Sequence, residues 1–173
     1  MPFINSAGAR VMLGLSVLCS LAWSEATAAE IGSIEDRLAI AERLAQYSYR
    51  WDSKDADGFA DLFTEDGVLE RRRGDALVTG SRVEGRQAIR DYARTSHRGR
   101  LADRQTRHHM SALVFVELST DVAITENMAL ITHQTEGDSA PFISGSGIYR
   151  NTWKKTARGW KIAKRVLFTD RQN

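Results

Sequence analysis

Apolar residues recur at helical spacing through the part of the chain that follows residue 32. Ser33 and Asp36 stand three residues apart, as in a capping box, and begin the first such stretch. Its apolar positions are Ile34, Leu38, Ala41, Leu44 and Ala45. This spacing predicts a helix from residue 33 to about residue 51, followed by shorter helices over 57–63 and 85–96.

Strand patterns dominate from residue 107 onward. Stretches rich in β-branched and aromatic residues, bounded by turn sequences, predict strands over 108–118, 123–135, 143–154 and 160–169. A shorter strand over 68–70, preceded by a turn at 65–67, is predicted to form a hairpin with 76–78. Helices followed by an antiparallel meander predict an α+β domain whose helices cover one face of a curved sheet.

The first thirty residues have a different composition. Arg10 precedes an apolar run from Val11 to Trp23, and small residues follow at Ala26 and Ala28. This order predicts a secretory signal peptide over residues 1–28 and hence a secreted or periplasmic protein. The apolar run is too short for a permanent anchor, so no stable membrane anchor is expected after cleavage, a retained anchor being the alternative. Residues 29–173 are then predicted to form a single domain.

Charge and cysteine content argue against several classes of function. The chain carries 24 Lys and Arg against 22 Asp and Glu, with no sustained basic face, so nucleic-acid binding is not expected. The single cysteine, Cys19, lies within the predicted signal peptide, which leaves the mature chain without disulfides or thiol ligands. No His-x-His or Glu-x-x-His pair indicates a metal site, and no cofactor is expected.

Candidate catalytic chemistry begins at Asp52, which follows Trp51 at the end of the first predicted helix. A carboxylate beside aromatic rings is poorly solvated, so the pKa of Asp52 is expected to rise toward the range useful for acid-base work. A solvated helix end is the alternative interpretation.

The first hairpin of the meander brings two histidines together. If residues 119–122 form its loop, Leu118 pairs with Ala123, and counting back places His108 opposite His133. The two side chains then share one face of the sheet, whereas His109 points the other way. A single-residue bulge would separate the two histidines, and a shift of two residues would keep them on one face.

Apolar residues are predicted to share the face that carries His108; they are Met110, Ala112, Val114 and Val116. This face is either the wall of a pocket or a plain core. Histidines in a plain core would still need hydrogen-bond partners, and Asp52 could supply one. The run Ser144-Gly145-Ser146-Gly147 lies inside a strand pattern, where it indicates curvature or close packing.

Three segments resemble, in the same order, the SnoaL-like branch of the NTF2-like superfamily. Residues 51–57 resemble the segment of scytalone dehydratase that holds its catalytic Asp, residues 106–108 the segment with its catalytic His, and residues 132–134 the segment with its second His. Hexachlorocyclohexane dehydrochlorinase and bacterial bile-acid dehydratase are related families. The resemblance spans about residues 33–170. It implies an NTF2-like cone, in which a curved antiparallel sheet and N-terminal helices close an apolar pocket.

By this resemblance the catalytic candidates are Asp52, His108, His133 and Tyr47. In the dehydratase pattern Asp52 bonds His133, and His108 transfers protons at the reacting carbon and the leaving group. In the dehydrochlorinase pattern Asp52 instead orients His108 as the base. Tyr47 stands five residues before Asp52, a spacing that resembles the bile-acid dehydratase pattern, and is a candidate donor.

Four further residues are candidates for substrate binding. Arg165 matches an active-site Arg of the dehydrochlorinase pattern. Trp51 and Met110 are expected beside the catalytic candidates, and Tyr49 is an alternative donor that faces nearly the opposite way from Tyr47 on a helix.

The resemblance implies a cofactor-independent lyase, a carbon-oxygen lyase of the dehydratase type, acting on a small apolar ring compound. Trp51 and Arg71 stand where the dehydratase has pocket tyrosines, so scytalone itself is not the expected substrate. Two alternatives stay open: ketosteroid-type isomerisation or polyketide ring closure in the same pocket, and a non-catalytic small-molecule-binding or oligomerising module. A homo-oligomer, dimer or trimer, is expected to bury the outer sheet face that carries Leu113 and Phe115.

Overall fold

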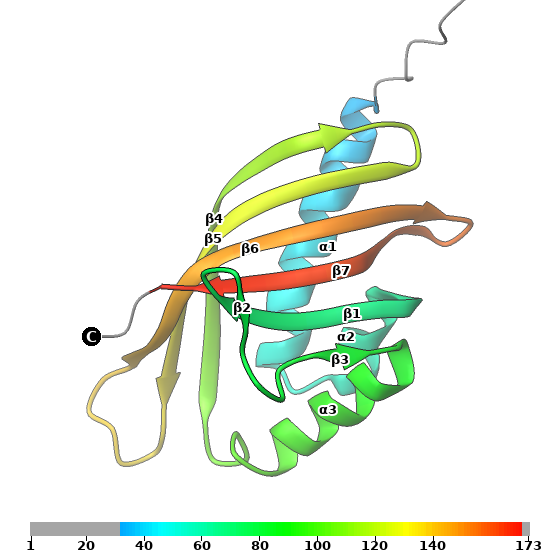
Figure 1. The fold of residues 1–173 in the computed structure, drawn as a ribbon. Helices are drawn as coiled ribbons and strands as arrows, with labels where there is room; N and C mark the ends of the chain where they lie inside the picture. The colour runs from blue at the N-terminus through cyan, green and yellow to red at the C-terminus, as the bar shows by residue number, and fades with distance from the viewer. Residues whose placement is uncertain (1–31, 171–173) are drawn as a thin grey trace, which may run out of the picture.

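A long helix packs against one face of a curved, open sheet, and two shorter helices lie at one end of it (Figure 1). The computed structural model describes residues 32–170. The helices are α1 (Ile34–Asp52), α2 (Ala56–Asp61) and α3 (Arg86–Arg98). The strands are β1 (Phe63–Arg73), β2 (Ala76–Leu77), β3 (Val83–Glu84), β4 (Gln105–Leu118), β5 (Val122–Gln134), β6 (Phe142–Thr156) and β7 (Gly159–Thr169).

The sheet has the strand order β2-β1-β7-β6-β5-β4, with β3 paired to the outside of β1. Strands β4 to β7 form an antiparallel meander, as predicted, and the α+β class with a curved antiparallel sheet is confirmed. The pairing of β1 with β7 is parallel and was not predicted. It joins the early part of the chain to its last strand, so that one continuous sheet backs all three helices.

Helix α1 begins where the capping box predicted. The Ser33 hydroxyl accepts from the backbone N–H of Asp36 at 3.2 Å, and the Asp36 carboxylate accepts from the backbone N–H of Ser33 at 3.2 Å. Four residues at helical spacing face the sheet and are buried: Ile40, Leu44, Tyr47 and Trp51. Ile40, Tyr47 and Trp51 join a core whose largest fully buried side chains include Phe59, Phe63, Ile89, Trp153 and Ile162. The spacing therefore directs the last turn of α1, with Asp52, into the fold.

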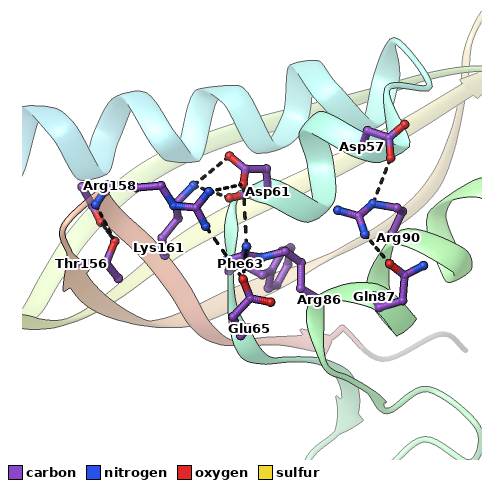
Figure 2. Close-up of polar contacts among 11 residues, drawn as sticks. Asp57, Asp61, Phe63, Glu65, Arg86, Gln87, Arg90, Thr156, Arg158 and Lys161 are labelled. Carbon is purple, nitrogen blue, oxygen red and sulfur yellow. Dashed lines mark hydrogen bonds and ion pairs between the residues drawn. The ribbon is translucent and has the colours of Figure 1, made fainter.

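Ion pairs and hydrogen bonds hold the short helices against the strands and against each other, as Figure 2 shows. Lys161 on β7, whose side chain is only 4% exposed, donates to the Asp61 carboxylate at the end of α2 at 2.9 Å. Arg86 in α3 donates to the backbone carbonyl of Phe63 at 2.9 Å. Arg90, one turn later, lies 2.9 Å from the carboxylate of Asp57 in α2. These contacts fix the end of the molecule at which α1 stops.

In the early part of the chain one local prediction was wrong and one short strand was missed. Residues 65–67 do not form a turn but belong to β1, where the register with β7 shifts between Phe63 and Val68. Gly67 allows the backbone to pass close to Phe63 at this irregularity, because a Cβ at Gly67 would lie 2.9 Å from the Cβ of Phe63. Strand β3 was also missed, since two residues carry too little pattern to be recognised.

Two irregularities in β4 overturn the predicted pairing of His108 with His133. Leu118 does pair with Ala123, but β4 then gains one residue between Phe115 and Glu117 and another between Ser111 and Val114. His108 consequently lies opposite Ile131, and Thr106 lies opposite His133. Each added residue moves the following side chains to the opposite face of the sheet, so two added residues restore the original face. The two histidines therefore still project from the same face, as diagonal neighbours.

The same irregularities correct the prediction about the rest of β4. Ala112 has a positive φ of 51° at the first bulge, beyond which the alternation is reversed. Phe115 packs against the core beneath the Arg37 guanidinium, whereas Val114 and Val116 are half exposed on the outer face. Leu113 and Phe115 are thus not the residues of the outer face, and Val114 and Val116 do not line a pocket with His108.

The predicted signal peptide, residues 1–28, lies outside the residues that the structure describes. Within residues 32–170, no helix combines the length and the apolar character needed to cross a bilayer.

Candidate functional site

A cavity of about 200 Å³ lies between the end of α1 and the sheet. This is several times the space that one water molecule needs. Its wall includes aromatic rings, two histidines, two arginines and hydroxyl groups, contributed by α1, α3, the segment after α3 and five strands. The lining residues include Tyr47, Trp51, Arg71, Arg100, His108, Ile131, His133, Ser144, Ser146 and Tyr149.

Asp52 and His108 form a hydrogen-bonded pair beside this cavity. One carboxylate oxygen of Asp52 lies 2.8 Å from Nδ1 of His108, and the other accepts from the His108 backbone N–H at 2.8 Å. The hydroxyl of Thr106 donates to Asp52 at 2.7 Å. The side chains of His108 and Asp52 are 8% and 10% exposed. The carboxylate therefore holds both the ring and the backbone of His108 in one orientation.

The protonation state of Asp52 decides the role that His108 can take. Burial raises the pKa of Asp52, but hydrogen bonds and charge from His108, together with the Thr106 hydroxyl, lower that pKa to below its ordinary value. The prediction of a raised pKa was therefore wrong, because it counted the aromatic surroundings and not these donors. An ionised carboxylate only accepts, so Nδ1 carries the proton and Nε2 is the nitrogen that can accept another.

His133 does not bond Asp52, contrary to the dehydratase pattern. It lines the cavity, its ring centroid lies 6.1 Å from that of Phe142, and its Nδ1 is buried without a hydrogen-bond partner in the described part of the chain. Burial lowers the pKa of His133, and the positive charges of Arg104 and Arg100 lower it further. His133 is thus a neutral imidazole whose hydrogen-bonding capacity is not fully used.

Tyr47 and Trp51 come from successive turns of α1 and both line the cavity. The centroid of the His108 ring lies 6.3 Å from that of Tyr47 and 6.4 Å from that of Trp51, edge to face in both cases. Burial holds the pKa of Tyr47 well above its ordinary value and raises that of Tyr149, although the Arg165 charge opposes both shifts. Both tyrosines therefore keep their O–H groups at neutral pH.

Three of the residues predicted to bind substrate, Tyr49, Met110 and Arg165, do not line the cavity. Tyr49 is 77% exposed, because it points about 160° away from Tyr47 around the helix. Met110 packs against Tyr149 and accepts a weak hydrogen bond from Asn127 at 3.2 Å. The predictions for Tyr49 and Met110 treated a position on the right element as sufficient for a place in the wall.

Arg165 is fully buried behind the cavity. Its guanidinium lies 3.6 Å from the ring centroid of Tyr47 and 3.7 Å from that of Tyr149, and it donates to the side-chain oxygen of Asn151 at 2.5 Å. Two aromatic faces thus stabilise this charge in place of a carboxylate. Arg165 packs against the two tyrosines that line the wall and is not itself a lining residue.

Several residues in the wall or directly beside it were not singled out from the sequence. Thr106 stands two residues before His108 on a strand, and this period-two spacing could have placed both beside Asp52. Tyr149 and Arg100 offered no such signal, because their positions depend on the packing of β6 and of the segment after α3.

Residues 32–166 match the family model of the SnoaL-like domain. The match covers most of the chain, which therefore belongs to the SnoaL-like family, as the sequence resemblance indicated. No match was found among the curated proteins.

Solved structures share the fold over most of the chain. A variant of Rv3472 from Mycobacterium tuberculosis, a protein of unknown function, is 30% identical, with a TM-score of 0.67 and coverage of 80% of this chain and 73% of that one. An NTF2-like protein with a cystatin-like fold from Novosphingobium aromaticivorans is 24% identical, with a TM-score of 0.68 and coverage of 80% and 84%. Aln2 from a Streptomyces species is 23% identical, with a TM-score of 0.67 and coverage of 82% and 95%. These likenesses support the NTF2-like architecture.

Proposed function

We propose that this protein is a cofactor-independent lyase that removes water from a hydroxylated ring compound, with His108 as the base. The observation that carries this proposal is the Asp52–His108 pair, held at 2.8 Å beside a cavity lined by aromatic rings. An ionised carboxylate on one ring nitrogen orients a histidine and stabilises its protonated form, which is how an imidazole becomes an effective general base.

The reaction needs one residue that both accepts and donates a proton. Nε2 of His108 takes a proton from the carbon next to a carbonyl group, and the electron pair of the broken C–H bond moves toward that carbonyl. The C–O bond of the neighbouring hydroxyl group then breaks. The proton held on His108 goes to the departing oxygen, so water leaves and a conjugated double bond remains. Asp52 stays ionised throughout and stabilises the imidazolium that forms in between.

Tyr47 and His133 support this sequence as hydrogen-bond donors. The raised pKa of Tyr47 keeps its hydroxyl protonated, so it can donate to an oxygen on which negative charge develops. His133 is a neutral imidazole and can donate from one ring nitrogen. Trp51 supplies a flat apolar surface against which a ring can stack.

The neutral tyrosine hydroxyls favour a second candidate, isomerisation or ring closure through the same enolate. In that reaction His108 returns the proton to a different carbon, or the enolate attacks a second carbonyl group, and no water is lost from the first step. Tyr47 and Tyr149, with ring centroids 6.0 Å apart, would stabilise the enolate oxygen. The two candidates share the abstraction of a proton by His108 and differ only in the fate of the enolate.

The test is turnover of a panel of β-hydroxy cyclic ketones, followed by absorbance of the conjugated product and by mass loss of one water. We expect conversion by the wild-type protein and a fall in kcat of about 10²–10⁴ fold in His108→Ala, because the general base is lost. Asp52→Asn should lower kcat as well, since the imidazolium loses its counter-charge.

The adjacent His109 provides the matched control. It is exposed, and its Nε2 lies 3.2 Å from the Thr132 hydroxyl, away from Asp52. His109→Ala should keep wild-type turnover. Conversion that survives in His108→Ala, or a panel that is not converted at all, would refute the lyase proposal. Products of unchanged mass would support the isomerase instead.

We also propose a secreted or periplasmic location and a homo-oligomeric state. The first rests on the charged, apolar and small-residue segments of residues 1–28. The second rests on apolar side chains that are exposed on the outer face of the sheet, among them Val114, Val116 and Met128.

A further inference from the structure

Two arginines on the cavity wall have no acidic partner. Arg71 on β1 makes no ion pair within 4.0 Å among the described residues, although its neighbour Arg72 is paired. Within residues 32–170 the Arg100 guanidinium likewise makes no ion pair within 4.0 Å, and its hydrogen-bond partners are the hydroxyls of Tyr92 and Ser96, both at 3.4 Å. Two unpaired cations beside one cavity repel each other, so they favour an occupant that carries negative charge.

The one acidic residue of the same wall does not neutralise them. Glu70 is fully buried and is already bound by Arg72 at 2.9 Å, Arg82 at 2.8 Å and Lys164 at 3.2 Å. Asp52 is likewise committed to His108 and Thr106. The exposed Asp170, which accepts from the Ser146 hydroxyl at 2.6 Å, is not a lining residue and forms no ion pair with either arginine within 4.0 Å among the described residues. With two arginines and one glutamate, the lining carries a net positive charge.

The cations and the proposed base differ in their exposure to solvent. Arg71 and Arg100 are exposed residues that line it, so they stand where the cavity meets solvent; we name this part the open end. His108 and Tyr47 are largely buried and form the inner part with Trp51. A molecule that fits both parts has an apolar ring at one end and a charged group at the other.

We propose that the substrate is a ring compound bearing an oxyanion, a carboxylate or a phosphate, which Arg71 and Arg100 bind at the open end while the ring lies against Trp51 and Tyr47. This inference rests on the proposed function only for the identity of the ligand as a substrate. The planar guanidinium group can donate two parallel hydrogen bonds to the oxygens of a carboxylate or a phosphate. The Ser144 hydroxyl on the same wall supplies a further donor, whereas the Ser81 hydroxyl already donates to the backbone carbonyl of Arg71 at 3.1 Å.

The test is equilibrium binding by isothermal titration calorimetry, with ligands matched in shape and different in charge. The pairs are 1-naphthoate with 1-naphthamide, and 1-naphthyl phosphate with 1-naphthol. We expect at least one anion to bind about tenfold or more tightly than its neutral partner, and this preference to shrink as salt rises. Preference for naphthoate assigns a carboxylate, and preference for naphthyl phosphate assigns a phosphate ester.

Matched variants separate the open end from general surface charge. Arg71→Gln and Arg100→Gln should each reduce the preference for the anion several-fold, and the double variant should remove it. Arg73→Gln on the same strand and Arg98→Gln at the end of α3 remove equal charge from exposed residues outside the wall, and should leave the preference unchanged. Equal reduction by the control variants would overturn the proposal.

Equal affinity for both members of each pair, including no binding of any of the four, would also overturn it. Because binding is measured without turnover, the result is independent of the lyase proposal. Selective binding of anions by a protein that converts no compound would refute the lyase and leave the anion site standing. Turnover restricted to uncharged ring compounds, with no binding preference for anions, would refute the anion site and leave the lyase proposal standing.

Discussion

Single residues in this protein act through the partners that surround them more than through their own chemical type. Asp52 and Asp36 are both carboxylates next to aromatic side chains, and both have a lowered pKa because donors outweigh burial. Asp52 meets a histidine beside the cavity, whereas Asp36 meets Lys155 at 2.7 Å and the Trp160 indole N–H at 2.8 Å far from it. The first is a candidate for chemistry and the second is a structural contact.

The structural role of Asp36 predicts a specific dependence of stability on pH. Hydrogen bonds from Lys155 and Trp160 lower the pKa of Asp36 from 3.8 to about 2. A depressed pKa in the folded state stabilises the protein above the pKa of the unfolded chain, and this contribution is lost as pH falls from about 4 toward 2. We expect Asp36→Asn to lower the free energy of unfolding by about 1–2 kcal/mol at pH 7 and by little near pH 2.

Urea unfolding at a series of pH values measures this difference. Glu42→Gln, on the exposed side of the same helix, is the control and should change stability by less than about 0.5 kcal/mol at every pH. A loss in Asp36→Asn that stays constant down to pH 2 would contradict the assigned pKa.

Among the strands, backbone irregularities determine which side chains reach the cavity. The two added residues in β4 move His108 from a position opposite His133 to a diagonal one on the same face, and they turn Val114 outward. Strands β6 and β7 approach each other closely at Gly147. A Cβ at this position would lie 2.2 Å from the backbone oxygen of Phe168. Of the two predictions for residues 144–147, curvature or close packing, close packing is confirmed at Gly147 but not at Gly145.

The contact at Gly147 predicts that added volume there is costly. Gly147→Ala should lower the free energy of unfolding by about 1–3 kcal/mol, because the backbone of β7 must move away. A Cβ added at Gly145, two residues earlier, would have no atom within 4 Å, so Gly145→Ala should change stability by less than about 0.5 kcal/mol. Thermal unfolding of the two variants compares them directly, and equal melting temperatures would contradict the packing argument.

In the molecule as a whole, the two faces of the sheet differ in how they are covered. The helices cover the inner face, and the outer face exposes an apolar patch made of Val114, Val116, Met128, Leu130 and Ile148. Glu126 and Arg150, an ion pair between β5 and β6, lie beside the patch. A second copy related by a two-fold axis would match apolar residues to apolar residues and could exchange these charges, which makes the patch self-complementary.

We therefore expect the protein to associate through the outer apolar patch. Sedimentation equilibrium should show a dimer for the wild-type protein and a monomer for Met128→Glu, whose side chain is 56% exposed on β5. Leu77→Glu, on β2 at the opposite end of the sheet order, is the control and should remain dimeric. A wild-type protein that is monomeric throughout the micromolar range would contradict this expectation.

The helices, the meander strands and the fold class could be predicted from the sequence because their signals are local. The capping box at Ser33, the period of α1 and the turn sequences between β4 and β7 each act over a few residues. The same local signals singled out Asp52 at a helix end and His108 on a strand. Their catalytic roles stay predictions.

Long-range contacts, in turn, determine which histidine bonds Asp52 and which residues line the cavity. They also determine where the unpaired arginines lie. Asp52 bonds His108 and not His133, and two bulges in β4 place His108 opposite Ile131. Bulges depend on the groups that both sides of a strand must pack against. Arg71 and Arg100 come to one cavity through the parallel pairing of β1 with β7 and the packing of α3. Segments distant in the chain set these features, and no short stretch of sequence encodes them.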